Sequence, residues 1–165
     1  MPRLERKLLK ESLNLKQGRD VNVITGNAGI DISAAVYTGF IPFLMINPAE
    51  GEGLVDCVID IDLDKATDGV NEVATASDTV VCALQTRVDG TNWVTTELMS
   101  SITLTGTAGS IADGKNGHKF KVGLVDPTGL VRVSIKLSAE RADCYIPYRV
   151  TYIGATPTVT PTSVA

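Results

Sequence analysis

The chain has 165 residues, of which 44% are hydrophobic and 21% are charged, and its net charge is −4. These values are typical of one globular domain that is long enough to bury a core without disulfides or metals. No run of about 18 apolar residues could span a membrane, and residues 1–11 lack the apolar core of a secretory signal. We therefore expect a protein made in a cytoplasm, with no membrane partner.

Residues 1–17 are the one segment with helical character, and residues 1–19 are predicted to form an N-terminal arm. Leu4, Leu8 and Leu15 fall near one stripe of good helix formers. Residues 1–20 hold six basic and three acidic side chains, a net charge of +3 that leaves −7 for the rest of the chain. We predict a basic N-terminal arm or short helix that either docks on a partner or packs on its own domain.

Residues 20–154 are predicted to form one β domain. Short apolar or alternating segments are separated there by Gly, Asn, Asp and Pro. The predicted strands cover residues 21–25, 29–37, 40–46, 54–63, 79–88, 93–98, 101–104, 119–124, 130–137 and 144–153. This pattern predicts an all-β fold, a jelly-roll-like β-sandwich of about 8–10 strands.

The strand at residues 54–63 alternates apolar and acidic side chains. Its apolar residues are predicted to point inward and its acidic residues outward: Val55, Cys57, Ile59, Ile61 and Leu63 against Asp56, Asp60, Asp62 and Asp64. The spacing does not fit an EF-hand calcium loop. The aspartates are then a solvated strand face, or like charges that a bound cation or a basic arm would neutralise.

Residues 79–98 predict a β-hairpin. Val80, Cys82 and Leu84 fall on one face of the first strand, while Gln85 falls on the other. Asp89-Gly90 predicts a two-residue type I′ turn, because this pair adopts positive φ at little steric cost. Trp93 would then anchor the return strand as part of the scaffold.

Two further features lie in the last third of the chain. The turn residues at 126–129 predict a second hairpin between residues 119–125 and 130–137. In its return strand Val131, Val133, Ile135 and Leu137 form the dry face, and Leu130, Arg132, Ser134 and Lys136 form the wet face. Residues 155–165 are uncharged and rich in Thr and Pro, which predicts a flexible tail unless a partner holds it.

No catalytic constellation stands out, and we expect neither enzyme activity nor a cofactor. The loop at residues 109–116 has P-loop spacing, but Asn116 replaces the required Ser or Thr and no helix follows. His118 is the only histidine and is placed in a loop. The cysteines Cys57, Cys82 and Cys144 are predicted to be buried hydrophobes, with a Cys57–Cys82 bridge left open. Nucleic-acid binding is disfavoured because the body is acidic.

Three segments carry a family resemblance: ALQTRVDGTNW at residues 83–93, GLVRVSIKLS at 129–138 and YIPYRVTYIG at 145–154. Together with the Thr/Pro tail, they resemble the cement, or decoration, proteins that stabilise bacteriophage heads. The resemblance implies a structural virion protein that trimerises on the capsid exterior, binds the major capsid protein and bridges capsomers. It implies no catalytic or metal residue.

On this interpretation the N-terminal arm contacts the capsid. The residues that we expect to bind the partner are Arg3, Leu4, Arg6, Lys7, Leu8 and Lys10. The alternative is a receptor- or carbohydrate-binding β-sandwich module of a phage tail or surface protein. Such a module should expose aromatic rings for sugar stacking.

Overall fold

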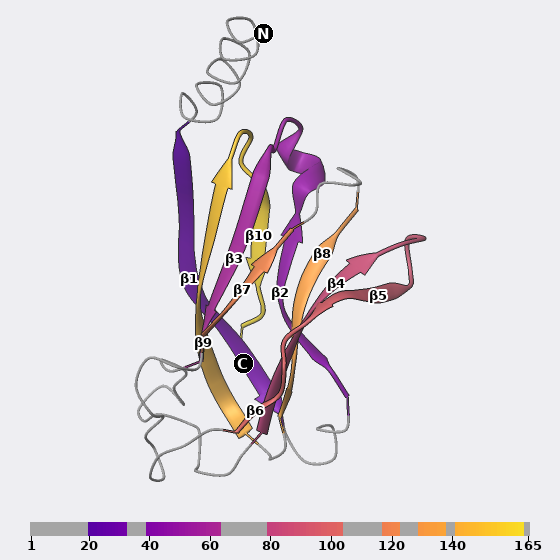
Figure 1. The fold of residues 1–165 in the computed structure, drawn as a ribbon, viewed down its shortest axis with the longest axis vertical. Coiled ribbons are helices and arrows are strands. Elements are labelled where there is room, and N and C mark those ends of the chain that lie inside the picture. Colours follow the sequence, from indigo (N-terminus) through magenta and orange to yellow (C-terminus); the bar gives the residue numbers. More distant parts are fainter. Residues whose placement is uncertain are drawn as a thin grey trace, which may run out of the picture.

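The computed structural model describes residues 20–32, 39–63, 79–103, 117–122, 129–137 and 141–163. Its strands are β1 (Val21–Ile32), β2 (Ile41–Asn47), β3 (Asp56–Asp62), β4 (Thr79–Arg87), β5 (Trp93–Leu98), β6 (Ile102–Thr103), β7 (Gly117–Lys121), β8 (Val131–Leu137), β9 (Arg141–Ile153) and β10 (Thr158–Pro161). A short 3-10 turn, η1 (Pro48–Gly51), follows β2 (Figure 1).

The strands form two antiparallel sheets. The four-stranded sheet has the order β1-β9-β3-β7, and the six-stranded sheet has the order β10-β2-β8-β4-β5. The two-residue strand β6 pairs with one end of β4, on the same edge that β5 occupies further along. On one side of the sandwich the edge strands of the two sheets are β5 and β7. On the other side they are β10 and β1.

The pairing of the strands is nested. The first of the long strands pairs with the last, β1 with β9, and then β2 pairs with β8, β3 with β7 and β4 with β5. A long antiparallel hairpin that folds over itself into two sheets gives this order, which is that of a jelly roll. The predicted fold class is confirmed, with β10 added at the outer edge of β2.

The core lies between the sheets and follows the predicted alternation. Cys57, Ile59 and Ile61 of β3 are buried, as are Val131, Val133 and Ile135 of β8. A register shift between Pro42 and Leu44 of β2 allows the consecutive residues Phe43 and Leu44 both to be buried. The prediction is wrong for Val55, which precedes β3 and is exposed.

Gly26 does not end a strand, although its sequence context predicts a break there. Residues 21–25 and the segment that follows belong to one strand, β1, which pairs with β9 without interruption from Val21 to Ile30. A Cβ atom added to Gly26 would lie 2.6 Å from the Tyr148 hydroxyl oxygen. Glycine is therefore needed here because a tyrosine side chain lies close to the backbone, and not because the chain turns.

Part of the C-terminal segment is a strand, so the prediction of a flexible tail is wrong for residues 158–161. Residues Thr158–Pro161 form β10, which pairs with β2. The Gly29 amide also donates to the Thr162 carbonyl (2.6 Å), and the Thr162 amide donates to the Phe43 carbonyl (2.9 Å). The threonine-rich segment has few apolar side chains, of which Val159 packs against the core, and the edge of β2 satisfies its backbone.

The second predicted hairpin is also wrong. β7 pairs with β3 in the four-stranded sheet, whereas β8 pairs with β2 and β4 in the other sheet. In a jelly roll, successive strands cross between the sheets, so a tight turn sequence does not imply that its flanking strands pair. His118 correspondingly lies within β7 and not in a loop.

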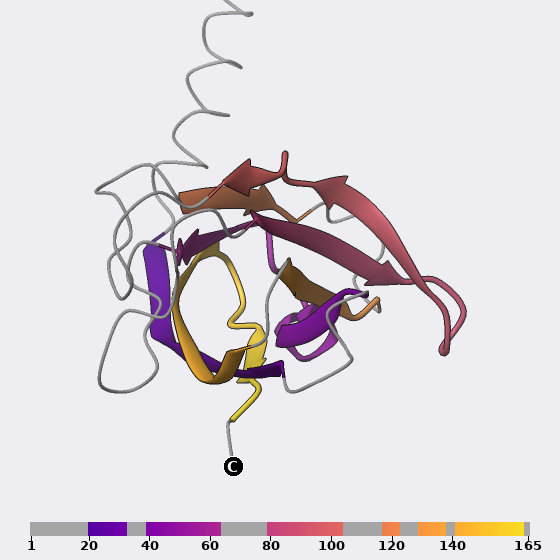
Figure 2. The same cartoon turned by 90° about the horizontal axis from the view of Figure 1, so that it is seen from below.

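The β4–β5 hairpin is confirmed, although its turn is longer than predicted. Five residues, 88–92, separate the strands, and the Val88 amide donates to the Asn92 carbonyl. Gly90 has φ +84°, which fits the positive φ expected of it. The hairpin runs out beyond the rest of the sandwich in both views (Figure 1 and Figure 2).

Candidate functional site

The predicted partner-binding residues Arg3, Leu4, Arg6, Lys7, Leu8 and Lys10 lie outside the described residues. The same is true of Asp64 and of the loop at residues 109–116. The described surface instead carries its most organised side-chain cluster on the outer face of the six-stranded sheet, near the base of the β4–β5 hairpin.

The outer-face cluster forms because the pairing of β8, β4 and β5 places its residues opposite one another. Arg132 of β8 lies opposite Gln85 of β4, and Gln85 lies opposite Thr95 of β5. Residues opposite each other in neighbouring strands share a face, so all three side chains project away from the core. The Arg132 guanidinium carbon lies 4.1 Å from the centroid of the Trp93 ring, which is a cation–π contact.

Gln85 is the centre of a buried hydrogen-bond network in this cluster. Its Oε1 atom accepts from Arg132 Nε and from Ser134 Oγ, both at 2.8 Å, and its Nε2 atom donates to Thr95 Oγ1 at 3.4 Å. Gln85 is 8% exposed and Ser134 is 0% exposed. Ser134 was expected on the wet face of its strand, but it is buried and hydrogen-bonded to Gln85.

The network holds the Arg132 guanidinium in one orientation. Gln85 binds its Nε–H group and Trp93 covers its plane, so the remaining four N–H donors are left for other partners. Partial burial lowers the pKa of Arg132 from its usual value. The group stays charged at neutral pH, because the unperturbed pKa of arginine lies far above 7.

The hairpin tip is organised by Asp89. Its Oδ1 atom accepts from the Asn92 amide (2.8 Å) and from the Thr91 amide (3.2 Å), and its Oδ2 atom accepts from Asn92 Nδ2 (2.6 Å). These hydrogen bonds, first among them the one from the Asn92 amide, lower the pKa of Asp89 to about 2. An Asx-type turn therefore replaces the predicted two-residue turn.

Apolar side chains are exposed around the same hairpin. Val88, Val94 and Leu98 are among the most exposed large hydrophobic residues of the described chain. Val94 lies opposite Thr86 and Leu98 lies opposite Ala83, so Val94 and Leu98 occupy different faces of β5. The projecting hairpin thus presents apolar contacts on both sides.

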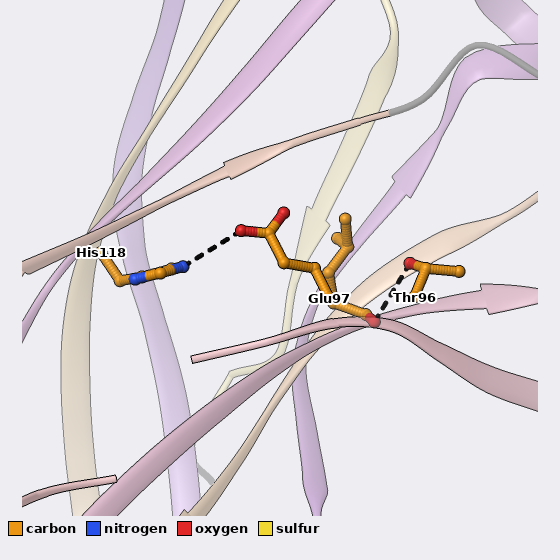
Figure 3. Close-up of polar contacts among 4 residues, drawn as sticks. Thr96, Glu97 and His118 are labelled. Atoms are coloured by element: carbon orange, nitrogen blue, oxygen red, sulfur yellow. Dashed lines mark hydrogen bonds and ion pairs between the residues drawn. The ribbon is translucent and has the colours of Figure 1, made fainter. Parts of the chain in front are cut away.

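The two sheets are also joined across one open side of the sandwich. His118 Nε2 lies 3.3 Å from Glu97 Oε1, and the two side chains point toward each other from β7 and β5 (Figure 3). A register shift in β5 leaves Thr96 without an opposite residue and places Glu97 opposite the core residue Leu84. The bulge therefore turns Glu97 inward to meet His118.

Asp60, in the middle of the aspartate row, is balanced within its own sheet. Asp60 lies opposite both Lys119 and Arg149, and Lys119 Nζ is 3.5 Å from Asp60 Oδ1. Over the described ranges, no group of three or more His, Cys, Asp or Glu side chains could hold a metal ion. Charge neutralisation at Asp60 therefore needs no second subunit.

The described cysteines are free and buried. Cys57 lies in β3 and Cys82 in β4, which belong to different sheets and are not adjacent strands. Burial raises the pKa of each thiol to about 12, with a smaller effect of Asp56 on Cys57. Both thiols are protonated at neutral pH and act as small hydrophobes in the core, as predicted.

A scan against protein-family models found no match, and searches of curated proteins and of solved structures found none either. Within the described part of the chain, no helix has the length and apolar character needed to cross a membrane. The resemblance to phage decoration proteins therefore stays a prediction from the sequence.

Proposed function

We propose that the protein is a structural virion protein that binds the outside of a bacteriophage capsid and stabilises it by bridging capsomers. Its partner in this role is the major capsid protein, and it acts without catalysis. It is made in the host cytoplasm and resides on the capsid exterior, where it assembles as a homotrimer.

The observation that carries the proposal is a jelly-roll fold with a projecting, partly apolar hairpin. Jelly rolls recur among viral capsid proteins and also among lectins, so the fold raises the expectation of a binding role by analogy. The β4–β5 hairpin extends from the sandwich (Figure 2). Val88, Val94 and Leu98 along it are exposed. Exposed apolar side chains on a projecting element favour a role in protein contact.

The physical role of such a protein follows from multivalency. A trimer offers three copies of one contact surface, and linked contacts bind far more tightly than each contact alone. Each site can then be modest in area while the assembly still resists the separation of capsomers.

A binding assay with capsids that lack the protein tests this proposal. We expect the purified protein to sediment with the capsids and to raise the temperature at which they open. If the protein stays in the supernatant at every concentration tested and leaves that temperature unchanged, the proposal fails.

A carbohydrate-binding module is the second candidate, and Trp93 is the observation that favours it. The indole lies on the outer face of the sheet beside the polar groups of Gln85 and Thr95, and sugar sites combine these features. Arg132 covers one face of the ring, which leaves at most the other for a sugar. Binding to a glycan array that is lost in Trp93→Ala, together with no capsid binding, would favour this candidate.

A further inference from the structure

The outer face of the six-stranded sheet is basic, although the chain as a whole is acidic. Arg87, Arg132 and Lys136 lie on this face, by the alternation of β4 and β8 that also turns Val131, Val133 and Ile135 into the core. Within the described part of these two strands and β5, the one acidic side chain is Glu97, which is turned inward.

The three basic side chains have no acidic partner within the described chain. An ion pair there joins Lys119 to Asp60 and a side-chain contact joins His118 to Glu97, and neither involves this face. The opposite, four-stranded sheet differs, because its outer face sets Asp60 between Lys119 and Arg149. One face of the sandwich is thus internally balanced and the other is not.

The groups around Arg132 preorganise its guanidinium for a ligand. Gln85 and Ser134, both more than nine-tenths buried, fix its Nε side, and Trp93 fixes its plane. A guanidinium held in this way loses little side-chain entropy when it binds, and its two remaining nitrogens match the two oxygens of a carboxylate.

We propose that this face, centred on Arg132 with Arg87 and Lys136 beside it, binds carboxylate groups on an acidic protein surface. Arg132 and Lys136 are four residues apart on β8, or about 13 Å, so they would engage separate carboxylates of the partner. The assignment of a capsid protein as the partner rests on the function proposed above. The assignment of a carboxylate-binding site does not rest on that function.

Two features favour a protein partner over an acidic polysaccharide. Tryptophan, arginine and methionine are enriched at the centres of protein interfaces, and Met45 lies opposite Arg132 on the same face. Leu98 lies opposite Ala83 on this face and is 59% exposed, which adds apolar area beside the charges. A polysaccharide would use the charges but not this apolar side chain.

The test compares binding of the full-length protein and its variants to capsids that lack it, to poly-L-glutamate and to alginate, whose charges are also carboxylates. We expect Arg132→Ala to weaken capsid binding roughly thirtyfold, as for an arginine at the centre of an interface. Arg87→Ala, which leaves the hydrogen bonds of Gln85 intact, should weaken binding several-fold. Lys121→Ala on the opposite sheet has the same charge change and should bind as the wild type does.

Arg132→Lys separates the geometry of this site from its charge. Lysine keeps the charge but loses the planar fork, so the variant should bind capsids nearly as weakly as Arg132→Ala. Circular dichroism and thermal unfolding would confirm that each variant is folded.

The outcomes separate this inference from the proposed function. Capsid binding that is unchanged in Arg132→Ala and Arg87→Ala would overturn the site and leave the function standing. Arg132-dependent binding to poly-L-glutamate without capsid binding would support the site and overturn the function. Arg132-dependent binding to alginate alone would overturn the protein partner.

Discussion

Gly154 is held in a conformation that other residues adopt only with strain. Its φ is +99°, and a Cβ atom at this position would lie 2.2 Å from the Gly53 carbonyl oxygen. The Ala155 amide donates to the same carbonyl, so the two segments cannot simply move apart. Here the chain leaves β9 and turns toward β10.

We expect Gly154→Ala to destabilise the protein by about 2 kcal/mol or more, because positive φ and a backbone clash act together. Gly39→Ala is the control, since nothing lies within 4 Å of the point that its added Cβ atom would occupy. Urea unfolding of both variants measures the difference. Equal stabilities would show that the Gly53–Gly154 contact is loose.

Gln85 matters because its loss would leave two groups unsatisfied. In Gln85→Leu, the buried Ser134 hydroxyl and the Arg132 Nε–H group lose their common acceptor. We expect a loss of about 1–3 kcal/mol in the free energy of unfolding. Thr95→Val removes only the long hydrogen bond to Gln85 Nε2 and should change stability by less than about 0.5 kcal/mol. A Gln85→Leu protein as stable as the wild type would contradict this account of the network.

Asp89 predicts an acid dependence for the hairpin. Its pKa is lowered to about 2 from 3.8, so its ionised form stabilises the fold fully above pH 3.8. That stabilisation is lost as the pH falls from 3.8 toward 2. We expect the Tm of the wild type to exceed that of Asp89→Asn by more at pH 6 than at pH 2. A Tm difference that is the same at both pH values would argue against an Asx-type turn held by the Asp89 carboxylate.

At the residue scale, the face of a side chain is predictable from the sequence and its partner is not. Period-two alternation alone is enough to place Gln85 and Arg132 on outer faces. Their hydrogen bond joins residues 47 positions apart, through the pairing of β4 with β8. Local sequence carries no signal for that pairing, so the burial of Gln85 and the stacking of Arg132 on Trp93 could not be foreseen.

At the scale of elements, β10 shows how tertiary context overrides composition. Residues 155–165 have too few apolar side chains to order themselves, yet residues 158–161 form a strand because the edge of β2 offers hydrogen bonds. The hairpin between β7 and β8 was predicted wrongly for a related reason, because a turn sequence does not reveal which sheet its flanking strands join. Strands with strict alternation, such as β3 and β8, were predicted well.

Removal of β10 tests its contribution to the fold. A protein truncated after Ala155 loses the ladder to β2 and the contacts of Thr162 with Gly29 and Phe43. We expect a loss on the order of 3 kcal/mol, from several backbone hydrogen bonds at about 1 kcal/mol each. Removal of residues 164 and 165 alone is the control. Equal thermal stability of both truncated proteins would mean that β10 adds nothing to the sandwich.

At the scale of the whole molecule, the sandwich is closed differently on its two sides. One side is joined by the backbone hydrogen bond from Gly29 of β1 to Thr162 after β10, and the other by the side-chain contact of His118 with Glu97. The β4–β5 hairpin extends from this second side (Figure 1). Its strands carry Arg87 and Trp93, which lie opposite each other on the basic outer face. Hairpin and basic face therefore form one continuous candidate surface for a capsid.

The most direct test of the proposed capsid-binding surface is hydrogen–deuterium exchange of the protein, free and bound to capsids that lack it. Amides of an edge strand and of an exposed turn exchange readily until a partner covers them. We predict slower exchange on binding at residues 88–98, which include the hairpin tip and β5, and unchanged exchange in β7 on the opposite sheet. Protection confined to the four-stranded sheet, or no protection at residues 88–98, would contradict the proposed surface.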